Sequence, residues 1–352
     1  MIPPTASPIH STSAWGSDVV RSAREAFAGK PVLVTGASGF IGRRLRDALI
    51  ELGADVVALR RAASPAPSRG RSVVAEYADA ASLERIVGEV RPEVVLHVAG
   101  ATKGVTYDDF RRANVLPTEN LLAALRAAHP SVSRFVHVSS LAAYGPSEPG
   151  LPHGEGAPRR PIEFYGESKL EAERVVEAQG EALPWTILRP AGVYGPGDVD
   201  YLGLFKPIER GLNVFFGNQA IATSMVYVDD VVRATLAAAT SPATRGKGYF
   251  VCDGAPVSFK ALGDAIVEAS GKRVTTVDFP DFLVDLAALG GEIATRLDGR
   301  PRLFNRQKAK MGRHHWTCRH DALRADVGYA PEVSMPEGVR RTLAWYRAER
   351  WL

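Results

Sequence analysis

The chain has only two cysteines in 352 residues, Cys252 and Cys318. A single pair cannot supply the several disulfides of a small secreted domain, and its spacing does not match a metal-binding motif. His314, His315 and His320 also lack the neighbouring carboxylates or cysteines that a metal site needs. We therefore expect a protein of the cytoplasm, which is a reducing compartment, without a bound metal.

Long apolar runs and long basic runs are also missing from the sequence. The most apolar late stretch, FLVDLAALGGEIA, is shorter than the roughly 20 residues that span a bilayer, and it contains acids. The net charge is only +4, and the arginine pairs are scattered instead of forming a nucleic-acid track. The first residues are rich in proline and serine and do not resemble a secretory signal. The sequence predicts no membrane span and no nucleic-acid partner.

What the chain does contain is an alternation of valine-rich apolar runs with segments of helical periodicity. Strands are expected at residues 31–36, 55–61, 93–100, 134–140 and 185–195, and helices at 42–53, 82–90, 114–129 and 165–179. Uninterrupted apolar strands that alternate with helices indicate a parallel sheet covered on both faces. The predicted fold class is α/β, with a Rossmann-type doubly wound sheet and a smaller C-terminal substrate lobe.

The same pattern predicts how the chain is divided. Residues 1–29 read as a flexible N-terminal extension, and residues 30–195 as a dinucleotide-binding Rossmann domain that carries the catalytic residues. After residue 195 the alternation loosens. Residues 196–352 are therefore expected to form mainly a substrate-binding lobe, with some segments returning to the sheet.

A glycine-rich segment, VLVTGASGFIGRRL, follows the first strand. Gly36 permits a tight turn, Gly39 lets the backbone approach a diphosphate, and Gly42 lets the helix pack on the strand. The N-terminus of the following helix presents N–H groups and a positive dipole end to the anion. The segment predicts a dinucleotide site that also includes Ser38, Phe40 and Ile41.

The end of the second strand distinguishes the two nicotinamide cofactors. An acid at this place accepts from the ribose hydroxyl and favours NAD. This chain has Arg60 and Arg61 there, and a guanidinium pairs with a 2′-phosphate through two hydrogen bonds. We expect NADP, with NAD less favoured, the alternative being that the arginines are solvated at a loop edge.

Seven segments occur in an order typical of one family: TGASGFIG, HVAGA, NVLPTENLL, HVSSLAAYG, YGESK, LRPAGVYGPGD and YVDDVV. Across roughly residues 30–350 the chain resembles an extended short-chain dehydrogenase/reductase of the NAD(P)-dependent epimerase/dehydratase superfamily. The form LRPAGVYGPGD resembles the branch that contains the 3β-hydroxysteroid dehydrogenases. Relatives often pair through the helices predicted at 114–129 and 165–179, which implies a homodimer.

The resemblance implies a role for each matching residue. The catalytic set is Ser140, Tyr165 and Lys169, with Asn114 as the helix asparagine that supports the lysine. The cofactor residues implied are Asp79 at the adenine amino group, Ala99 and Gly100 along the cofactor, Pro190 and Val193 at the nicotinamide carboxamide, and Tyr165 and Lys169.

The chemistry of Tyr165 and Lys169 also follows from their spacing. Four residues apart on a helix, the two side chains share one face. A free phenol titrates near pH ~10, so proton transfer at neutral pH requires that its anion be stabilised. An ammonium on the same face and an oxidised nicotinamide ring both supply positive charge. Ser140 would hydrogen-bond and orient the substrate oxygen. The spacing alone favours an ordinary exposed pair, and it is the glycine loop and the HVSS segment upstream that favour the catalytic pair.

Two missing anion contacts bear on the substrate. Nucleotide-sugar enzymes of the family usually carry an asparagine shortly after the arginine that Arg189 matches, and this chain has Pro-Ala-Gly there. They also often carry an arginine before the VDD segment, and no arginine lies between Asn218 and Val228. A diphosphate buried without such partners is costly. The sequence therefore predicts an NADP-dependent oxidoreductase that interconverts a ketone and a secondary alcohol on a largely apolar small molecule, such as a steroid, a polyketide-like or a fatty β-keto compound.

Two other functions stay open at this point. The first is a nucleotide-sugar epimerase, dehydratase or reductase, and the second is a non-catalytic NADP-binding regulator. An apolar stripe could close over the substrate or simply belong to the core; it comprises Phe282, Leu283, Leu286, Leu289 and Ile293. Lys103 either contacts a substrate oxygen or is a surface lysine, and Arg302, Arg306 and Lys308 either meet an anionic substrate tail or are solvated.

Overall fold

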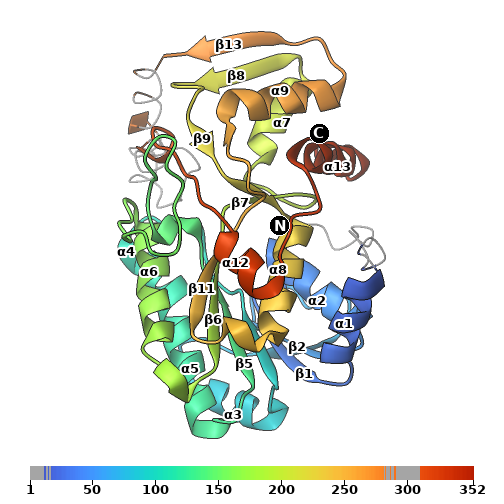
Figure 1. The fold of residues 1–352 in the computed structure, drawn as a ribbon, viewed down its shortest axis with the longest axis vertical. Coiled ribbons are helices and arrows are strands. Elements are labelled where there is room, and N and C mark those ends of the chain that lie inside the picture. Colours follow the sequence, from blue (N-terminus) through green and yellow to red (C-terminus); the bar gives the residue numbers. More distant parts are fainter. Residues whose placement is uncertain are drawn as a thin grey trace.

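The computed structural model describes residues 17–280 and 310–352, together with Thr12, Trp15, Phe282, Leu286, Leu289 and Gly290. Within this part of the chain, the largest sheet has seven parallel strands in the spatial order β11-β6-β5-β4-β1-β2-β3 (Figure 1). Their bounds are β1 Pro31–Thr35, β2 Asp55–Arg60, β3 Arg71–Val74, β4 Val94–His97, β5 Arg134–Val138, β6 Trp185–Pro190 and β11 Lys247–Val251. The predicted Rossmann-type doubly wound sheet is confirmed.

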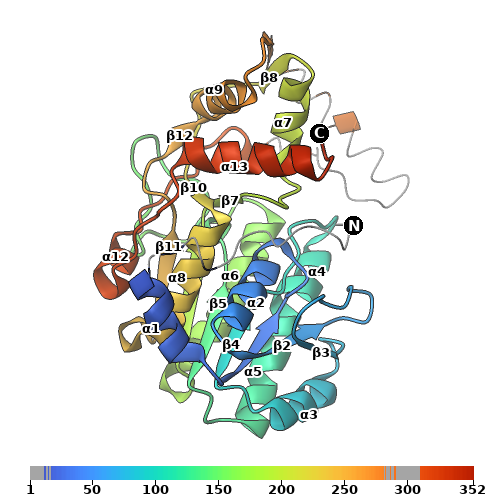
Figure 2. The ribbon, with the colours of Figure 1, turned by 90° about the vertical axis from the view of Figure 1, so that its right-hand side faces the viewer.

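Helices cover both faces of this sheet, as Figures 1 and 2 show. Because successive strand residues point to opposite faces, Val32 and Val34 enter one core and Leu33 enters the other. The first core is closed by α1 Ser17–Phe27, α2 Phe40–Glu51 and α8 Val228–Thr240, and the second by α3 Ala80–Val90, α5 Leu116–Ala128 and α6 Phe164–Glu177. Burial on both sides explains why the strands read as uninterrupted apolar runs.

The N-terminal extension differs from the expectation of flexibility through residue 29. Ser17–Phe27 form helix α1, and Phe27 is fully buried in the core beneath α2 and α8. Val20 and Ala23 pack against the same core. These three residues are spaced as one face of a helix, and burying that face stabilises α1. The proline- and serine-rich composition of the first residues does not extend into this segment.

The smaller lobe lies above the sheet in Figure 1 and consists mostly of later residues. It contains α7 Leu202–Glu209, β8 Leu212–Phe216, α9 Phe259–Ser270, β13 Thr275–Phe279 and α13 Met335–Ala348. Strands β8 and β13 pair in parallel, and the helices enclose a separate core around Phe205, Ile266 and Leu343. In contrast, α8, β11 and α12 Asp321–Val327 pack on or within the larger lobe.

Residues 185–195, expected as one strand, form two. Strand β6 ends at Pro190, and β7 Gly192–Tyr194 pairs with β10 Met225–Tyr227 outside the main sheet. The chain changes partners at Ala191, whose N–H still bonds the Val251 carbonyl. Apart from Thr186 and Arg189 the run is apolar or glycine, so its pattern does not reveal the break.

The expected helix at 114–129 is the end of a longer helical segment. Residues Tyr107–Phe110 form α4, Arg111–Val115 form a π-helical turn, and α5 follows. Pro117 lies in the first turn of α5, as predicted, where the chain does not need its missing N–H. Asn114 lies in the π turn, a conformation often found at functional sites.

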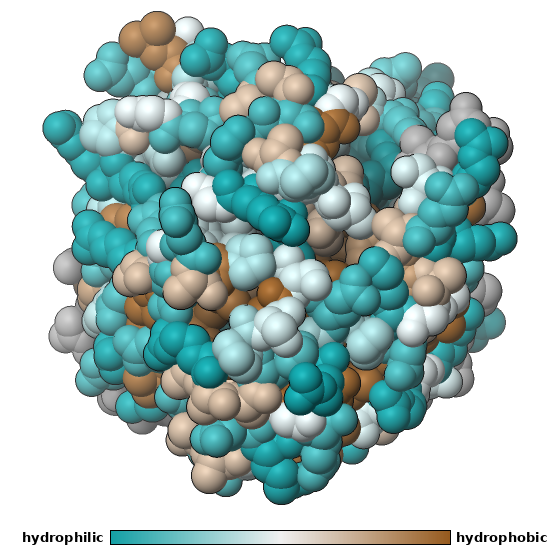
Figure 3. All heavy atoms as spheres, turned by 60° about the horizontal axis from the view of Figure 1, so that its bottom comes forward, coloured by the Kyte–Doolittle hydropathy of each residue, from teal (hydrophilic) through white to brown (hydrophobic). Residues whose placement is uncertain are grey.

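The surface is mostly polar on the face that Figure 3 presents. Hydrophobic residues lie there in small groups among hydrophilic ones. None of the helices in the described residues combines the length and the apolar character that a bilayer crossing requires.

Candidate active site

Most of the predicted site residues follow the carboxyl ends of neighbouring strands. The glycine loop follows β1, Ala99 and Gly100 follow β4, Ser140 follows β5, and Pro190 ends β6. In an open parallel sheet this edge is where ligands bind, at the point where the strand order reverses. Here the order reverses between β1 and β4.

The glycine loop has room only for glycine at two positions. Gly36 has a φ of +66°, and a Cβ there would lie 2.8 Å from the Ala99 nitrogen. A Cβ on Gly42 would overlap the Gly36 carbonyl oxygen. Helix α2 begins at Phe40, and Gly39 precedes it without a side chain that could cap the helix. The loop therefore fits the backbone cradle that a dinucleotide diphosphate requires.

The residues expected around the adenosine are at or near the surface. The Arg60 guanidinium donates to the Ser64 carbonyl at 2.9 Å and lies 3.4 Å from the Ser72 hydroxyl. Arg61 is exposed beside it. Asp79 is exposed too, and its carboxylate accepts from the Ser82 N–H at 3.0 Å as the cap of α3. The loop thus holds one guanidinium in place and leaves the other exposed.

Asn114 joins the loop after β4 to helix α6. Its side-chain oxygen accepts from the Ala101 N–H at 2.7 Å, and its amide donates to the Ala101 carbonyl at 3.1 Å and to the Ser168 hydroxyl at 2.8 Å. A Cβ on Gly100 would lie 2.9 Å from the Asn114 oxygen. Asn114 therefore fixes this loop beside the helix that carries Tyr165 and Lys169.

The structure brings Ser140, Tyr165 and Lys169 together. The Ser140 side chain lies near enough to the phenol of Tyr165 to lower its pKa, and its hydroxyl accepts from the Ala142 N–H at 3.1 Å. Lys169 is buried, and its Nζ donates to the Val138 carbonyl at 2.8 Å. The three polar groups thus lie within one small region between the end of β5 and the first turns of α6.

Burial sets the protonation of two of these groups. It raises the pKa of Tyr165 to about 12, against the hydrogen bond from Ser140, and nearby Glu163 and Asp200 raise that pKa further. It lowers the pKa of Lys169 to about 8, partly offset by Glu173. At neutral pH the phenol is therefore protonated and can donate, while the lysine remains charged but close to titrating.

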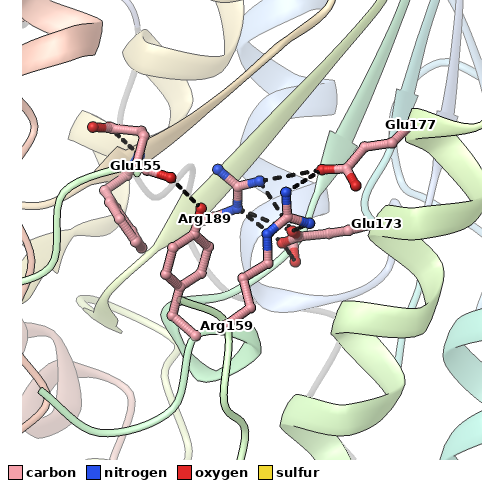
Figure 4. A network of polar contacts seen from close by, with 8 residues as sticks. Glu155, Arg159, Glu173, Glu177 and Arg189 are labelled. Carbon is pink, nitrogen blue, oxygen red and sulfur yellow. Dashed lines mark hydrogen bonds and ion pairs between the residues drawn. The ribbon is translucent and has the colours of Figure 1, made fainter. Parts of the chain in front are cut away.

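Glu173, one turn after Lys169 on α6, is a residue that the sequence patterns did not single out. It is fully buried and accepts from Arg189 through both carboxylate oxygens, from the Ser139 hydroxyl at 2.5 Å and from Arg159 at 3.2 Å. Figure 4 shows Arg159 and Arg189 converging on Glu173, with Glu177 beside them. Ser139 precedes Ser140 and Arg189 precedes Pro190, so Glu173 ties three site-bearing elements together.

Lys103, in the loop after β4, pairs with Asp200 at 3.0 Å, and both side chains are about half exposed. Asp200 acts electrostatically on Tyr165, which places this ion pair near the phenol. Lys103 is therefore close to the site, although its partner in the structure is a carboxylate of the chain itself. Across the described residues, no cluster of three or more His, Cys, Asp or Glu side chains is arranged to hold a metal ion.

Part of the expected substrate region lies outside the described residues. Leu283 and Ile293 of the apolar stripe are among these, as are the cationic residues Arg302, Arg306 and Lys308. The described members of the stripe are exposed, with Phe282 at 66% and Leu286 at 64%. These side chains do not belong to the core.

Comparison with known sequences assigns the family. The sequence model of the NAD dependent epimerase/dehydratase family matches residues 32–252. The chain belongs to this family. The predicted resemblance is thereby confirmed, and the chain is an NAD(P)-dependent enzyme acting on alcohol and carbonyl groups.

Two curated relatives and one solved structure illustrate the breadth of the epimerase/dehydratase family. The 4-hydroxy-2-methyl-3-oxo-4-farnesyl-3,4-dihydroquinoline-1-oxide ketoreductase of Stigmatella aurantiaca is 31% identical, over 87% of this chain and 93% of the relative. The 2-alkyl-3-oxoalkanoate reductase of Stenotrophomonas maltophilia is 29% identical, over 89% and 98%. The UDP-glucose 4-epimerase of Thermus thermophilus, solved with NAD, has a TM-score of 0.72 at 26% identity, over 90% of this chain and 98% of that chain.

Proposed function

We propose that this family member interconverts a ketone and a secondary alcohol on a largely apolar small molecule, with NADP(H) as its cofactor. The observation that carries the proposal is the protonated, half-buried phenol of Tyr165, which lies near Ser140 and one helical turn from the Lys169 ammonium. Such a group supplies a proton to a carbonyl oxygen that receives a hydride. The nicotinamide of the bound cofactor supplies or accepts that hydride.

The chain's own residues handle the proton. In reduction, the Tyr165 Oη donates its proton to the carbonyl oxygen, which also accepts from the Ser140 hydroxyl. The Lys169 Nζ stabilises the resulting phenolate, and it is fixed for this task by the Val138 carbonyl. In oxidation the same phenolate removes the alcohol proton. Asn114 and Glu173 act indirectly, since they position the loop and the helix that carry these groups.

The preference for an apolar substrate is supported at Gly192, which follows β6. A Cβ at this position would overlap the hydroxyl of Tyr201, so an asparagine there would require the Tyr201 side chain to move. A nucleotide diphosphate would therefore lack an amide partner at this point. The two curated relatives are named as a ketoreductase of a farnesyl-bearing compound and a reductase of 2-alkyl-3-oxoalkanoates. Both names favour the same substrate class here.

We assign NADP over NAD because Arg60 ends β2 and Arg61 follows it, at the place where an acid would favour NAD. In the same proposal, residues 30–195 bind mainly the cofactor and residues 196–352 bind mainly the substrate.

We place the enzyme in the cytoplasm as a homodimer that pairs through α5 and α6. Light scattering of the purified protein tests the dimer, and a monomeric mass at micromolar concentration would contradict it.

The experiment that tests the function is a substrate panel. NADPH oxidation is followed with apolar ketones, including a steroid ketone and a fatty β-keto acid, and product formation is followed with UDP- and dTDP-sugars. We expect turnover with at least one ketone and none with the sugars. Epimerisation or dehydration of a nucleotide sugar would favour the first alternative. Tight NADPH binding without turnover on any substrate would favour a regulator.

A further inference from the structure

The only two cysteines of the chain, far apart in sequence, meet in the folded protein. Cys252 directly follows β11 and is fully buried, and Cys318 is almost fully buried. The Cys252 thiol donates to the Cys318 carbonyl oxygen at 3.4 Å, and the two side chains pack in the same buried cluster. Both cysteines are free thiols in the structure. Two thiols in contact are placed to form a disulfide once they are oxidised.

A histidine completes the cluster. The His320 Nδ1 lies 3.5 Å from the Cys252 Sγ, and its ring packs edge-on against Tyr329. His320 is only partly buried, so its ring connects the thiol pair to the protein surface. The hydrogen bond with Cys318 lowers the pKa of the Cys252 thiol to about 6, with burial opposing this and His320 adding to it. Burial raises the pKa of the Cys318 thiol. The two thiols therefore differ in acidity, and Cys252 is the one that ionises more readily.

The backbone around Cys318 is held firmly. Its N–H donates to the Ser224 hydroxyl at 3.1 Å, and the hydroxyl donates back to the Cys318 carbonyl at 3.3 Å. On the other side, the Arg319 N–H donates to the His153 carbonyl at 2.9 Å. Cys318 therefore keeps its place beside Cys252 as part of the packed structure.

We propose that Cys252 and Cys318 form a peroxide-responsive thiol pair, in which Cys252 is oxidised first and Cys318 resolves it to an intramolecular disulfide. The Cys252 thiol gives its proton to His320 and the thiolate sulfur attacks one peroxide oxygen. The O–O bond breaks, His320 protonates the departing hydroxide, and a sulfenic acid and water form. The Cys318 sulfur then displaces the sulfenic oxygen as a second water, and the S–S bond forms. Two thiols are oxidised and one peroxide is reduced to two waters.

The disulfide would lie directly beside the catalytic region. The Val251 carbonyl, one residue before Cys252, accepts from the Ala191 N–H between β6 and β7. Both cysteines pack in the cluster that contains Leu141 and Ala142, which follow Ser140, and that Tyr165 joins. The cross-link would fix the segment around Cys318 to the end of β11. The inference concerns a site separate from the proposed active site and does not depend on its function.

The test treats the purified native protein with stoichiometric hydrogen peroxide at neutral pH and then maps its peptides without reduction. We expect one linked pair of peptides containing Cys252 and Cys318, lighter than the separate peptides by two hydrogen atoms, and its loss on adding dithiothreitol. The oxidised protein should melt several degrees higher, because the link constrains the unfolded chain. Unlinked thiols after this treatment, or a sulfinic acid at either cysteine, would overturn the proposal.

Three variants separate the roles. Cys318→Ser should leave Cys252 as a sulfenic acid that a dimedone probe labels, whereas Cys252→Ser should leave Cys318 unlabelled. His320→Phe should slow disulfide formation roughly tenfold or more, since the thiolate loses its proton acceptor. His153→Phe is the control, because the His153 ring bonds the Gly145 and Pro146 carbonyls and its loss should not change the rate. Equal rates for both histidine variants would contradict the role of His320.

Discussion

Arg189 donates to both carboxylate oxygens of Glu173, from Nε to Oε1 at 3.0 Å and from Nη2 to Oε2 at 3.0 Å, and both side chains are almost fully buried. A bidentate pair of this kind fixes orientation as well as distance. Because Glu173 is on α6 and Arg189 is at the end of β6, the pair sets the position of the Lys169 helix over the sheet.

The first prediction concerns this pair. Glu173→Ala should lower the free energy of unfolding by about 3–5 kcal/mol, because buried Arg189 loses its bidentate partner and keeps only the more distant Glu177 carboxylate at 3.8 Å. Glu173→Leu combined with Arg189→Met should cost much less than the sum of the single changes. Urea denaturation of the wild type, Glu173→Ala, Glu173→Leu, Arg189→Met and the double variant measures both effects. The exposed pair Arg85–Glu89 serves as control, and its removal should change stability by less than ~1 kcal/mol.

The role of Glu173 could not be predicted from the sequence. Its partners Ser139, Arg159 and Arg189 come from separate segments, and only long-range packing brings them to one carboxylate. The meeting of Cys252 with Cys318 and the burial of Phe27, the last residue of α1, in the core lined by α2 and α8 have the same origin. Local spacing contains no information about such contacts.

The parts that could be predicted depend on local rules. The parallel sheet follows from uninterrupted valine-rich runs, since strands buried on both faces carry no polar alternation. The glycine loop follows from Gly36 and Gly42, because any side chain there meets backbone. The nearness of Tyr165 and Lys169 follows from helical spacing alone. The break between β6 and β7 could not be seen, since both sides of Ala191 are equally apolar.

The second prediction concerns cofactor choice. Replacing both Arg60 and Arg61 by Ala should raise the KM for NADPH by at least ~10-fold and leave that for NADH nearly unchanged, because only NADPH carries the 2′-phosphate. Steady-state kinetics with each cofactor measures the change. Arg71→Ala is a control, since Arg71 pairs with Asp55 at the exposed start of β3. Equal losses for the two cofactors would remove the basis for NADP.

The third prediction is a pH dependence. Burial lowers the pKa of Lys169 to about 8 and raises that of Tyr165 to about 12. The lysine therefore loses its charge before the phenol loses its proton, and kcat/KM for NADPH in ketone reduction should be level below pH ~7 and fall above pH ~8. Lys169→Arg should move the fall to higher pH, because a guanidinium stays charged. A profile unchanged by this substitution would assign the fall to another group.

The central claim is that the Tyr165 phenol supplies the proton, and the most direct test is Tyr165→Phe. The measurement is single-turnover oxidation of bound NADPH with a ketone substrate, together with the NADPH dissociation constant of the same protein. The account predicts a rate lower by at least ~100-fold with cofactor binding retained, which is the usual contribution of a positioned acid. A variant that binds NADPH normally and reduces the ketone at a near-normal rate would contradict it.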